Sequence, residues 1–343
     1  MRLLLLGGTD FAGRAVAEAA RDRGWDVTVF HRGEHPAPRG VRVLRGDRTE
    51  RGGLGALAAW DGGGGGVGGG DGGGVGGGEW DAVVDTWSGA PTVVRDTARL
   101  LADRVGRYAF VSSRSVYAWP APAGLDEFGP LAEGDPDVEA TDFAADKRGA
   151  ELAVVRELGA ERALLVRPGL ILGPRENAGR LPWWLARISR GGDVPAPGPR
   201  DTPLQYVDAR DLADWLLTAL DKGLHGPYNL VSEPGHTTIG DLLDLCVRVT
   251  GSTARLHWTT PEAIEAAGVS PWTDLPMWAP PGTDFHAAIH AGDVTRALAT
   301  GLRCRPAEET VADTWTWQRT VPEGELKTAE GLSAEAEERL LRP

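Results

Sequence analysis

The sequence contains few cysteines and no long apolar run, and each shortage excludes a class of protein. Cys246 and Cys304 are the only cysteines in 343 residues, and their spacing fits neither a metal site nor a redox motif. We expect both to be buried thiols of a cytosolic protein. The apolar opening RLLLL ends at Gly7, and it is too short for a signal peptide or a membrane span.

Basic charge and metal ligands are also scarce. The formal net charge is −13, whereas proteins that bind phosphate backbones or anionic membranes normally carry a basic face. The seven histidines are scattered without the spacing of metal ligands, which predicts no metal. We therefore expect a cytoplasmic protein, monomeric or homodimeric, whose partner is a small-molecule substrate rather than a nucleic acid or a membrane.

Apolar segments of strand length alternate with helix-period segments through the first half of the chain. RLLLL is followed by the helical pattern FAGRAVAEAARDRG, and four more strand candidates are DVTVF, VRVLRGD, WDAVVDTWS and RYAFVSS. Continuous apolar strands separated by helices are typical of a parallel sheet with both faces covered. The predicted fold class is α/β.

Glycine is abundant, and much of it lies in one tract between VRVLRGD and WDAVVDTWS, the third and fourth strand candidates counted from RLLLL. The tract, residues 62–78, cannot bury apolar surface and has high chain entropy, which predicts a flexible surface loop. No helix begins directly after it, so a phosphate-binding role is not expected there.

The second half of the chain is more mixed and predicts a second lobe. RALLVRPGLILGP is a sixth strand candidate, PLQYVDARD a seventh, and the chain becomes richer in Pro and Trp from about residue 261. We expect a first domain over 1–170, to which 203–233 returns, and a substrate-binding lobe over 171–202 and 234–325, with the substrate between them. Residues 326–343 are a charged tail that either forms a last helix or frays.

The segment GGTDFAGR follows the first strand and opens the first helix. Gly7 allows a tight turn, Gly13 allows the helix to lie close to the sheet, and the helix N-terminus offers N–H groups to a pyrophosphate. This arrangement predicts dinucleotide binding.

These residues resemble the extended and atypical short-chain dehydrogenase/reductase superfamily, the NAD-dependent epimerase/dehydratase group. The usual fingerprint of that group is GxxGxxG; Asp10 replaces its middle glycine, and the segment is similar to the GGTxFxGR subgroup. The resemblance covers most of residues 1–235. It implies a Rossmann-type doubly wound parallel sheet with a smaller mixed C-terminal substrate lobe, and an NAD(P) cofactor.

The end of the second strand bears on the choice of cofactor. Sites for NAD typically carry Asp or Glu here for the ribose hydroxyls, but this chain has His31 and Arg32. A guanidinium can bind a phosphate through two hydrogen bonds and stack on adenine, which favours NADP over NAD. Asp47, after the third strand, resembles the adenine-contacting acid of the superfamily.

The segment YAFVSSRSVYAW resembles the fifth strand of the superfamily and places Ser113 at the hydroxyl that binds a substrate oxygen. The family pair Tyr-x-x-x-Lys lies on one face of a helix, because four residues make about one turn. Lys147 is the matching lysine. The resemblance implies that it hydrogen-bonds the nicotinamide ribose and lowers the pKa of the tyrosine.

Phe143 stands at the tyrosine position and keeps the ring without the oxygen. Three explanations are open: a deliberate Tyr→Phe variant of an active enzyme, an enzyme that uses another proton donor, with Tyr117 the nearest candidate, or a cofactor-binding protein without catalysis. Loss of proton transfer would lower the rate by about 10²–10⁴-fold.

The remaining expected contacts follow from the resemblance and from aromatic composition. The expected cofactor-binding residues are Gly7, Thr9, Asp10, Phe11, Gly13, His31, Arg32, Asp47, Thr86, Ser88, Lys147 and Pro168. The expected substrate-binding residues are Arg114, Arg180, Trp183, Trp184 and Trp278. Nucleotide-sugar members usually have an asparagine after the sixth strand, where this chain has Pro168-Gly169-Leu170, which weakens a UDP-sugar interpretation.

Together these features predict an NAD(P)-dependent oxidoreductase, or an epimerase or dehydratase that acts through transient oxidation, on a small carbonyl or alcohol. The competing prediction is a catalytically inactive, NADP-sensing regulatory protein. An RNA-binding role, known in the atypical subgroup, is disfavoured by the acidic charge.

Overall fold

The computed structural model describes residues 1–60, 80–322 and 324–342. The predicted flexible loop at 62–78 lies outside these residues. By contacts the chain divides into two compact units: unit 1 contains 1–119, 129–168 and 212–229, and unit 2 contains 120–128, 169–211 and 230–343.

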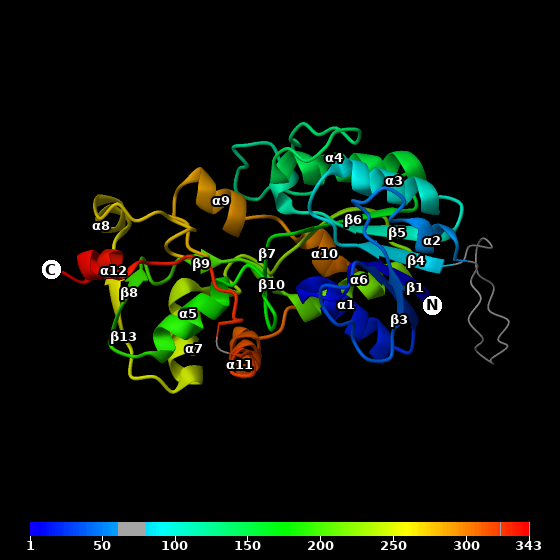
Figure 1. Cartoon of the computed structure of the whole chain (residues 1–343). Helices are drawn as coiled ribbons and strands as arrows, with labels where there is room; N and C mark the ends of the chain where they lie inside the picture. Colours follow the sequence, from blue (N-terminus) through cyan, green and yellow to red (C-terminus); the bar gives the residue numbers. More distant parts are fainter. Residues whose placement is uncertain (61–79, 323, 343) are drawn as a thin grey trace. The chain divides into compact units, whose positions relative to one another are not determined.

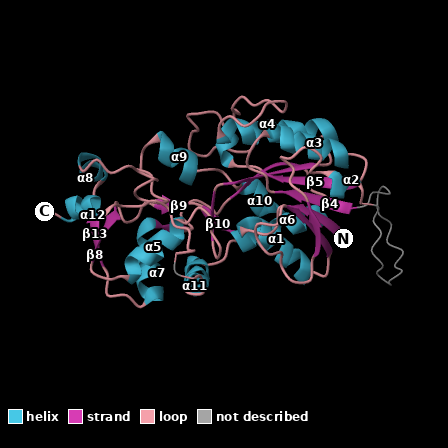
Figure 2. Ribbon diagram, in the orientation of Figure 1, coloured by secondary structure: helices cyan, strands magenta, loops and turns pink. Residues whose placement is uncertain are grey.

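Unit 1 is built on a seven-stranded sheet of order β11-β6-β5-β4-β1-β2-β3 (Figure 2). Neighbouring strands from β6 to β3 pair in parallel, which confirms the predicted α/β class with a Rossmann-type sheet. The strands are β1 (Arg2–Leu6), β2 (Asp26–His31), β3 (Arg42–Arg45), β4 (Trp80–Asp85), β5 (Val105–Val111), β6 (Ala163–Pro168) and β11 (Gly226–Leu230).

Helices cover both faces of this sheet (Figure 1). On one face α3 (Pro91–Leu101) and α4 (Phe143–Leu158) pack side by side, and on the other lies α1 (Phe11–Asp22). The four leucines of β1 are fully buried, and successive side chains of a strand point to opposite faces. Both faces of the sheet are therefore apolar at this strand. The short α2 (Gly55–Ala58) follows β3.

The predicted sixth strand is divided in two, which corrects the expectation of one continuous strand. β6 ends at Pro168, and β7 (Leu170–Leu172) pairs instead with β10 (Tyr206–Asp208) in a separate two-stranded sheet. The parallel register of β6 with β5 ends at Val166, and Pro168 has no N–H to donate to a further ladder.

Unit 2 contains three two-stranded sheets and most of the remaining helices. Its strands are β7, β8 (Asp193–Pro197), β9 (Pro203–Leu204), β10, β12 (Thr237–Thr238) and β13 (Arg255–Thr259). Its helices are α5 (Arg180–Ser189), α7 (Ile239–Thr250), α8 (Pro261–Ala266), α9 (Asp284–His290), α10 (Thr295–Thr300), α11 (Ala307–Gln318) and α12 (Ala334–Leu341), and α6 (Ala209–Asp221) extends from unit 2 into unit 1.

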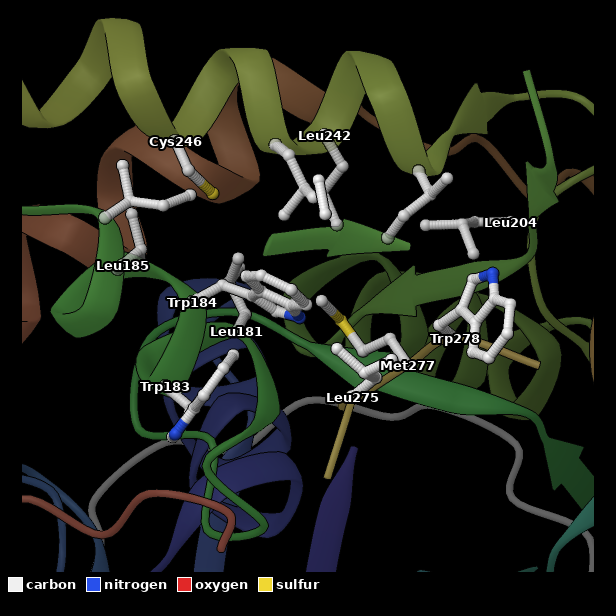
Figure 3. Close-up of a cluster of buried hydrophobic side chains, with 14 of the residues drawn as sticks. Leu181, Trp183, Trp184, Leu185, Leu204, Leu242, Cys246, Leu275, Met277 and Trp278 are labelled. Carbon is white, nitrogen blue, oxygen red and sulfur yellow. The ribbon is translucent and has the colours of Figure 1, made fainter. Parts of the chain in front are cut away.

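The core of unit 2 lies between α5 and α7 (Figure 3). Leu181 and Trp184 of α5 face Leu242 and Cys246 of α7, and Met277 lies beside them. The predicted tail at 326–343 includes α12, which packs against β8. No helix in the described part of the chain has the length and apolarity needed to cross a bilayer.

The predicted domain limits remain a prediction. Contacts place 203–211 and 230–233, which we expected to return to the first domain, in unit 2. They place 212–229 in unit 1.

Candidate functional site

The turn between β1 and α1 brings backbone segments closer together than side chains would allow. Gly7 and Gly8 have φ values of +107° and +82°, which favour glycine. A Cβ at Gly13 would lie 2.8 Å from the backbone nitrogen of Gly8, and a Cβ at Gly7 would lie 2.5 Å from the Thr86 hydroxyl oxygen. The first and last glycines of the motif therefore keep this turn compact, and Thr86 lies against it.

Asp10 caps the helix that follows this turn. Its carboxylate accepts a hydrogen bond from the Phe11 N–H at 3.0 Å, so one of the N-terminal donors of α1 is already used. Phe11 has a φ of +32° and is buried, unlike an ordinary first helical residue. Asp10 thus takes a structural role at the position of the middle glycine.

Positive charge gathers at the carboxyl ends of β2 and β3. His31 is buried and opposite Arg45 in the strand register; burial lowers the pKa of its imidazole, and Arg45 and His35 lower it further. Nε2 of His31 has no hydrogen-bond partner among the described residues. Arg32 is exposed and forms an ion pair with Glu34 at 3.0 Å.

Asp47 lies just beyond β3 in a self-contained turn. Its carboxylate accepts hydrogen bonds from the N–H and the hydroxyl of Thr49, at 2.9 and 2.7 Å, and these bonds lower the pKa of the carboxyl group. The acid expected to contact adenine is therefore ionised and held in a fixed orientation.

A buried ionic cluster that sequence analysis missed lies beneath the ends of β4 and β5. Asp85 binds Arg48 through two hydrogen bonds of 2.7 and 2.8 Å and accepts a third, of 2.7 Å, from the Tyr108 hydroxyl. Asp85 also accepts from the Trp87 N–H at 3.0 Å, which fixes the loop that carries Thr86 and Ser88. Arg48 and Asp85 are 37 positions apart, and no local pattern in the sequence indicates that they pair.

Lys147 joins the ends of two central strands. Its ammonium group donates to the backbone carbonyl of Trp87, after β4, and to that of Val111, at the end of β5, at 2.8 Å. The side chain is buried, and this burial lowers the pKa of the amine to about 8. Lys147 therefore lies where Ser88 and Ser113 begin the loops beyond those strands.

Ser113 follows β5, one of the two strands that Lys147 joins, and Phe143 lies on α4 with Lys147. Ser113 is half-buried, and its hydroxyl oxygen caps a 3₁₀ turn by accepting from the Ser115 N–H at 3.1 Å. Phe143 begins α4 with about half of its surface exposed (51%), and the centre of its ring lies 5.9 Å from Nζ of Lys147. The aromatic ring and the amine are thus neighbours, as the spacing of four residues predicts.

Tyr117 belongs to a buried polar network rather than to an open site. Its hydroxyl donates to Asn229 at 2.7 Å and accepts from Arg167 at 3.3 Å. Arg167 in turn forms two hydrogen bonds of 2.8 Å with Glu151. A structural role for Tyr117, rather than that of a proton donor, accounts for these contacts.

The tryptophans expected to line a substrate pocket lie mainly in the core of unit 2. Trp184 and Trp278 are fully buried (Figure 3), and the Trp184 indole donates to the Pro276 carbonyl at 2.8 Å. Trp183 is also buried and packs edge-on against Trp184, with ring centres 4.7 Å apart. Core packing therefore explains these three side chains without a ligand.

Arg180 differs from its neighbours because it is only half-buried and stacks on an aromatic ring. Its guanidinium carbon lies 4.8 Å above the centre of the Trp272 ring, and Trp272 has a φ of +69°. Glu176 is buried beside it and accepts from the N–H groups of Arg180 and Leu181 at the start of α5. Burial raises the pKa of Glu176 to about 7. Arg114, the other expected anchor, is buried in unit 1.

No group of three or more His, Cys, Asp or Glu side chains in the described ranges is arranged to hold a metal ion.

Part of the chain matches a family model, and the fold matches solved structures. Residues 78–230 match the model of the NAD dependent epimerase/dehydratase family. They include Lys147, Phe143 and Ser113, whereas the glycine turn lies before the matched region. No curated protein matches the chain.

Several solved structures share the fold. They include a Thermus thermophilus UDP-glucose 4-epimerase in complex with NAD, at 18% identity over 94% of this chain and 100% of that chain, with a TM-score of 0.63. A Bacillus cereus UDP-N-acetylglucosamine 4-epimerase has 14% identity, 93% and 99% coverage and a TM-score of 0.64. A Thermotoga maritima UDP-glucose 4-epimerase with UDP-glucose has 17% identity, 93% and 99% coverage and a TM-score of 0.61. At this identity the likeness establishes the fold.

The turn between β1 and α1 fits a dinucleotide, the kind of cofactor named in the description of the matched family. The crowding at Gly7 and Gly13 leaves backbone, rather than side chains, at the start of α1, as dinucleotide binding requires. The basic groups near His31 supply donors for an anionic substituent. The negative charge of the Asp10 carboxylate would repel an anion bound at the start of α1.

Proposed function

We propose that the chain is an NAD(P)-dependent oxidoreductase or epimerase/dehydratase-type enzyme that acts on a small carbonyl or alcohol substrate. The observation that carries the proposal is the position of Lys147, whose buried amine holds the ends of β4 and β5 next to Ser113. Burial of a lysine amine has a desolvation cost. Holding two backbone carbonyls together would not by itself require a residue with that cost.

When bound, the cofactor accepts or returns a hydride. The chain would hold it with Gly7, Thr9, Gly13 and Thr86 at the glycine turn, and with Ser88 and Pro168 near the strand ends. Ser113 would orient the substrate oxygen, because its hydroxyl oxygen is already fixed by Ser115. Lys147 would hold the cofactor ribose or the reacting group.

NADP is the proposed cofactor in preference to NAD. The electrostatic influence of Arg45 and His35 on His31 indicates positive potential at the end of β2, where NAD-specific sites carry an acid. Arg32 can leave its exposed ion pair with Glu34 at little cost, because surface ion pairs contribute about 0–1 kcal/mol. A phosphate bound there would gain charge-assisted hydrogen bonds.

Two substrate classes are open within this proposal. The similar structures include UDP-sugar epimerases, which favours a sugar nucleotide. The sequence Pro168-Gly169-Leu170 after β6 favours a smaller carbonyl compound. In either case the proposed group for an anionic part of the substrate is Arg180, whose guanidinium is stacked on Trp272.

The experiment is a turnover assay of the whole chain with NADP⁺ and NAD⁺ in separate reactions. UDP-glucose, UDP-N-acetylglucosamine and a panel of small alcohols and ketones are tested by absorbance at 340 nm and by chromatography of the sugar products. Cofactor reduction or epimerised product supports the proposal. Tight NADPH binding with no turnover of any substrate would contradict it and favour the second candidate, an inactive NADP-sensing protein, which the phenylalanine at position 143 supports.

A further inference from the structure

We propose that the side-chain amine of Lys147 is itself the group that removes and returns the proton of the reacting alcohol. This inference rests on the proposed function and assigns the proton-transfer step of that site. It is motivated by Phe143, which has no polar atom, and by the nearness of its ring to Nζ of Lys147, at 5.9 Å.

The hydrogen bonds of Lys147 suit an amine that gains and loses a proton. A neutral primary amine has two N–H donors and one lone pair, and an ammonium group has three donors. Nζ donates to two carbonyl oxygens, those of Trp87 and Val111, and no third acceptor for it occurs among the described residues. Both bonds can persist in either protonation state, so proton transfer would not require the side chain to move.

The charges that face Lys147 are already committed to other partners. Asp85 from β4 interacts electrostatically with Lys147 but is bonded to Arg48, which itself opposes the ammonium charge. Glu151, one turn further along α4, is bonded to Arg167. Lys147 therefore forms no direct ion pair with a described carboxylate.

Burial consequently dominates and lowers the pKa of Lys147 to about 8, although the rings of Phe110 and Phe143 favour the charged form. At pH 8 about half of the amine is neutral, whereas an ordinary lysine with a pKa of about 10.4 would be almost fully charged. An acid or base is most effective when its pKa lies near the working pH.

The proton balance of the step is simple. In alcohol oxidation a bound NAD(P)⁺ would take up the hydride of the C–H bond. The O–H proton would join the lone pair of neutral Lys147, which would become an ammonium group as the carbonyl forms. In carbonyl reduction the ammonium group returns that proton to oxygen. Oxidation therefore accelerates as the pH rises through 8, and reduction slows.

The first test measures the titration of Lys147 without cofactor or substrate. Lys147, Lys222 and Lys327 are the only lysines of the chain, and the other two are exposed. Protein labelled with ¹³C at lysine Cε should give three resonances by NMR, with Lys147 assigned by its loss in Lys147→Arg and the others by Lys222→Arg and Lys327→Arg. A midpoint near pH 8 for Lys147 supports the proposal, and a midpoint near 10 or above overturns it.

The second test compares two variants at position 147 with a substrate found in the turnover assay. Lys147→Arg keeps a cation and donors for both carbonyls but cannot release a proton at these pH values. We expect it to lose about 10²–10⁴-fold in kcat when the cofactor is saturating. Lys147→Met should lose kcat equally and lose the pH dependence near 8.

The outcomes separate this inference from the function on which it rests. Failure of the wild-type chain to bind either dinucleotide overturns the proposed function. If wild-type binding and turnover are present while Lys147→Arg keeps full kcat with an unchanged pH profile, only the proton role of Lys147 is overturned. If Lys147→Arg does not fold, Lys147→Met serves instead. A kcat that still changes through pH 8 in Lys147→Met overturns the proton role of Lys147.

Discussion

Arg167 and Glu151 form a doubly hydrogen-bonded ion pair in the interior of unit 1. Both bonds are 2.8 Å long, and the two side chains are 2% and 0% exposed. Arg167 lies on β6 and Glu151 on α4, so the pair fixes the helix that carries Phe143 and Lys147 to the sheet. Its energetic role can be measured independently of any ligand.

Removing one member of this pair should destabilise the protein more than removing both. Glu151→Gln leaves a buried guanidinium without its counter-charge, and the expected loss in the free energy of unfolding is about 3–5 kcal/mol. The double variant Glu151→Leu/Arg167→Met should recover more than half of that loss. Urea unfolding followed by circular dichroism measures both, and equal losses for the single and double variants would contradict this account.

Phe143→Tyr should increase turnover. The ring is half-exposed, so an added hydroxyl meets no packing barrier, and it would lie near the Lys147 amine, whose charge stabilises a phenolate. We expect kcat to rise by at least about tenfold, within the range that general acid–base catalysis provides. Phe128→Tyr, at another exposed phenylalanine, is the control and should leave kcat unchanged. Unchanged kcat in Phe143→Tyr would show that position 143 does not face the reacting oxygen.

Arg180→Gln should weaken substrate binding without affecting the cofactor. The guanidinium stacks on Trp272 and, under the proposed function, binds the anionic part of the substrate. We expect KM to rise about tenfold or more, since a charged hydrogen bond contributes about 1.5–3 kcal/mol, with the Kd for NADPH unchanged. Arg319→Gln is a matched control, because Arg319 stacks on Trp315 in the same way. Equal KM values for the two variants would argue against the role of Arg180.

Glu176 should make stability depend on pH between about 4.5 and 7. Burial raises its pKa from 4.5 to about 7, so in this window the folded chain binds more protons than the unfolded chain. The stabilisation by Glu176 is complete below pH 4.5 and is lost as the pH rises through 7, by about 3 kcal/mol.

Glu176→Gln removes this titration and keeps the shape of the side chain. Chemical denaturation at pH 4.5, 6 and 8 should therefore show that the free energy of unfolding depends less on pH in Glu176→Gln than in wild type. Glu325→Gln, at an exposed position, corrects for the change in net charge. Parallel profiles for Glu176→Gln and wild type would show that the buried carboxyl does not titrate in this window.

Local patterns in the sequence were enough to predict β1 to β5 of unit 1. Four buried leucines before Gly7 mark β1, and the glycine turn with its following helix has few alternative structures. The position of Lys147 beside Phe143 follows from helical spacing alone. These features depend on residues close together in the chain.

Features that depend on tertiary packing could not be predicted. The pairing of Arg48 with Asp85 joins segments 37 residues apart, and no periodicity marks it. Trp184 and Trp278 were expected in a pocket because tryptophan suits both a ligand wall and a core, and only their full burial distinguishes the two. Pro168 lacks an N–H donor, and this indicated a break in the sixth strand. The apolar residues on both sides of it nevertheless led to the prediction of one continuous strand.

Dinucleotide affinity tests the central claim most directly. Isothermal titration of the whole chain should give a measurable Kd for NADPH that is at least about tenfold tighter than that for NADH. Gly13→Ala should abolish binding because its Cβ would lie 2.8 Å from the Gly8 nitrogen, and Gly55→Ala, where no atom lies within 4 Å, should bind normally. Absence of binding of both NADPH and NADH to the folded wild-type chain would contradict the account.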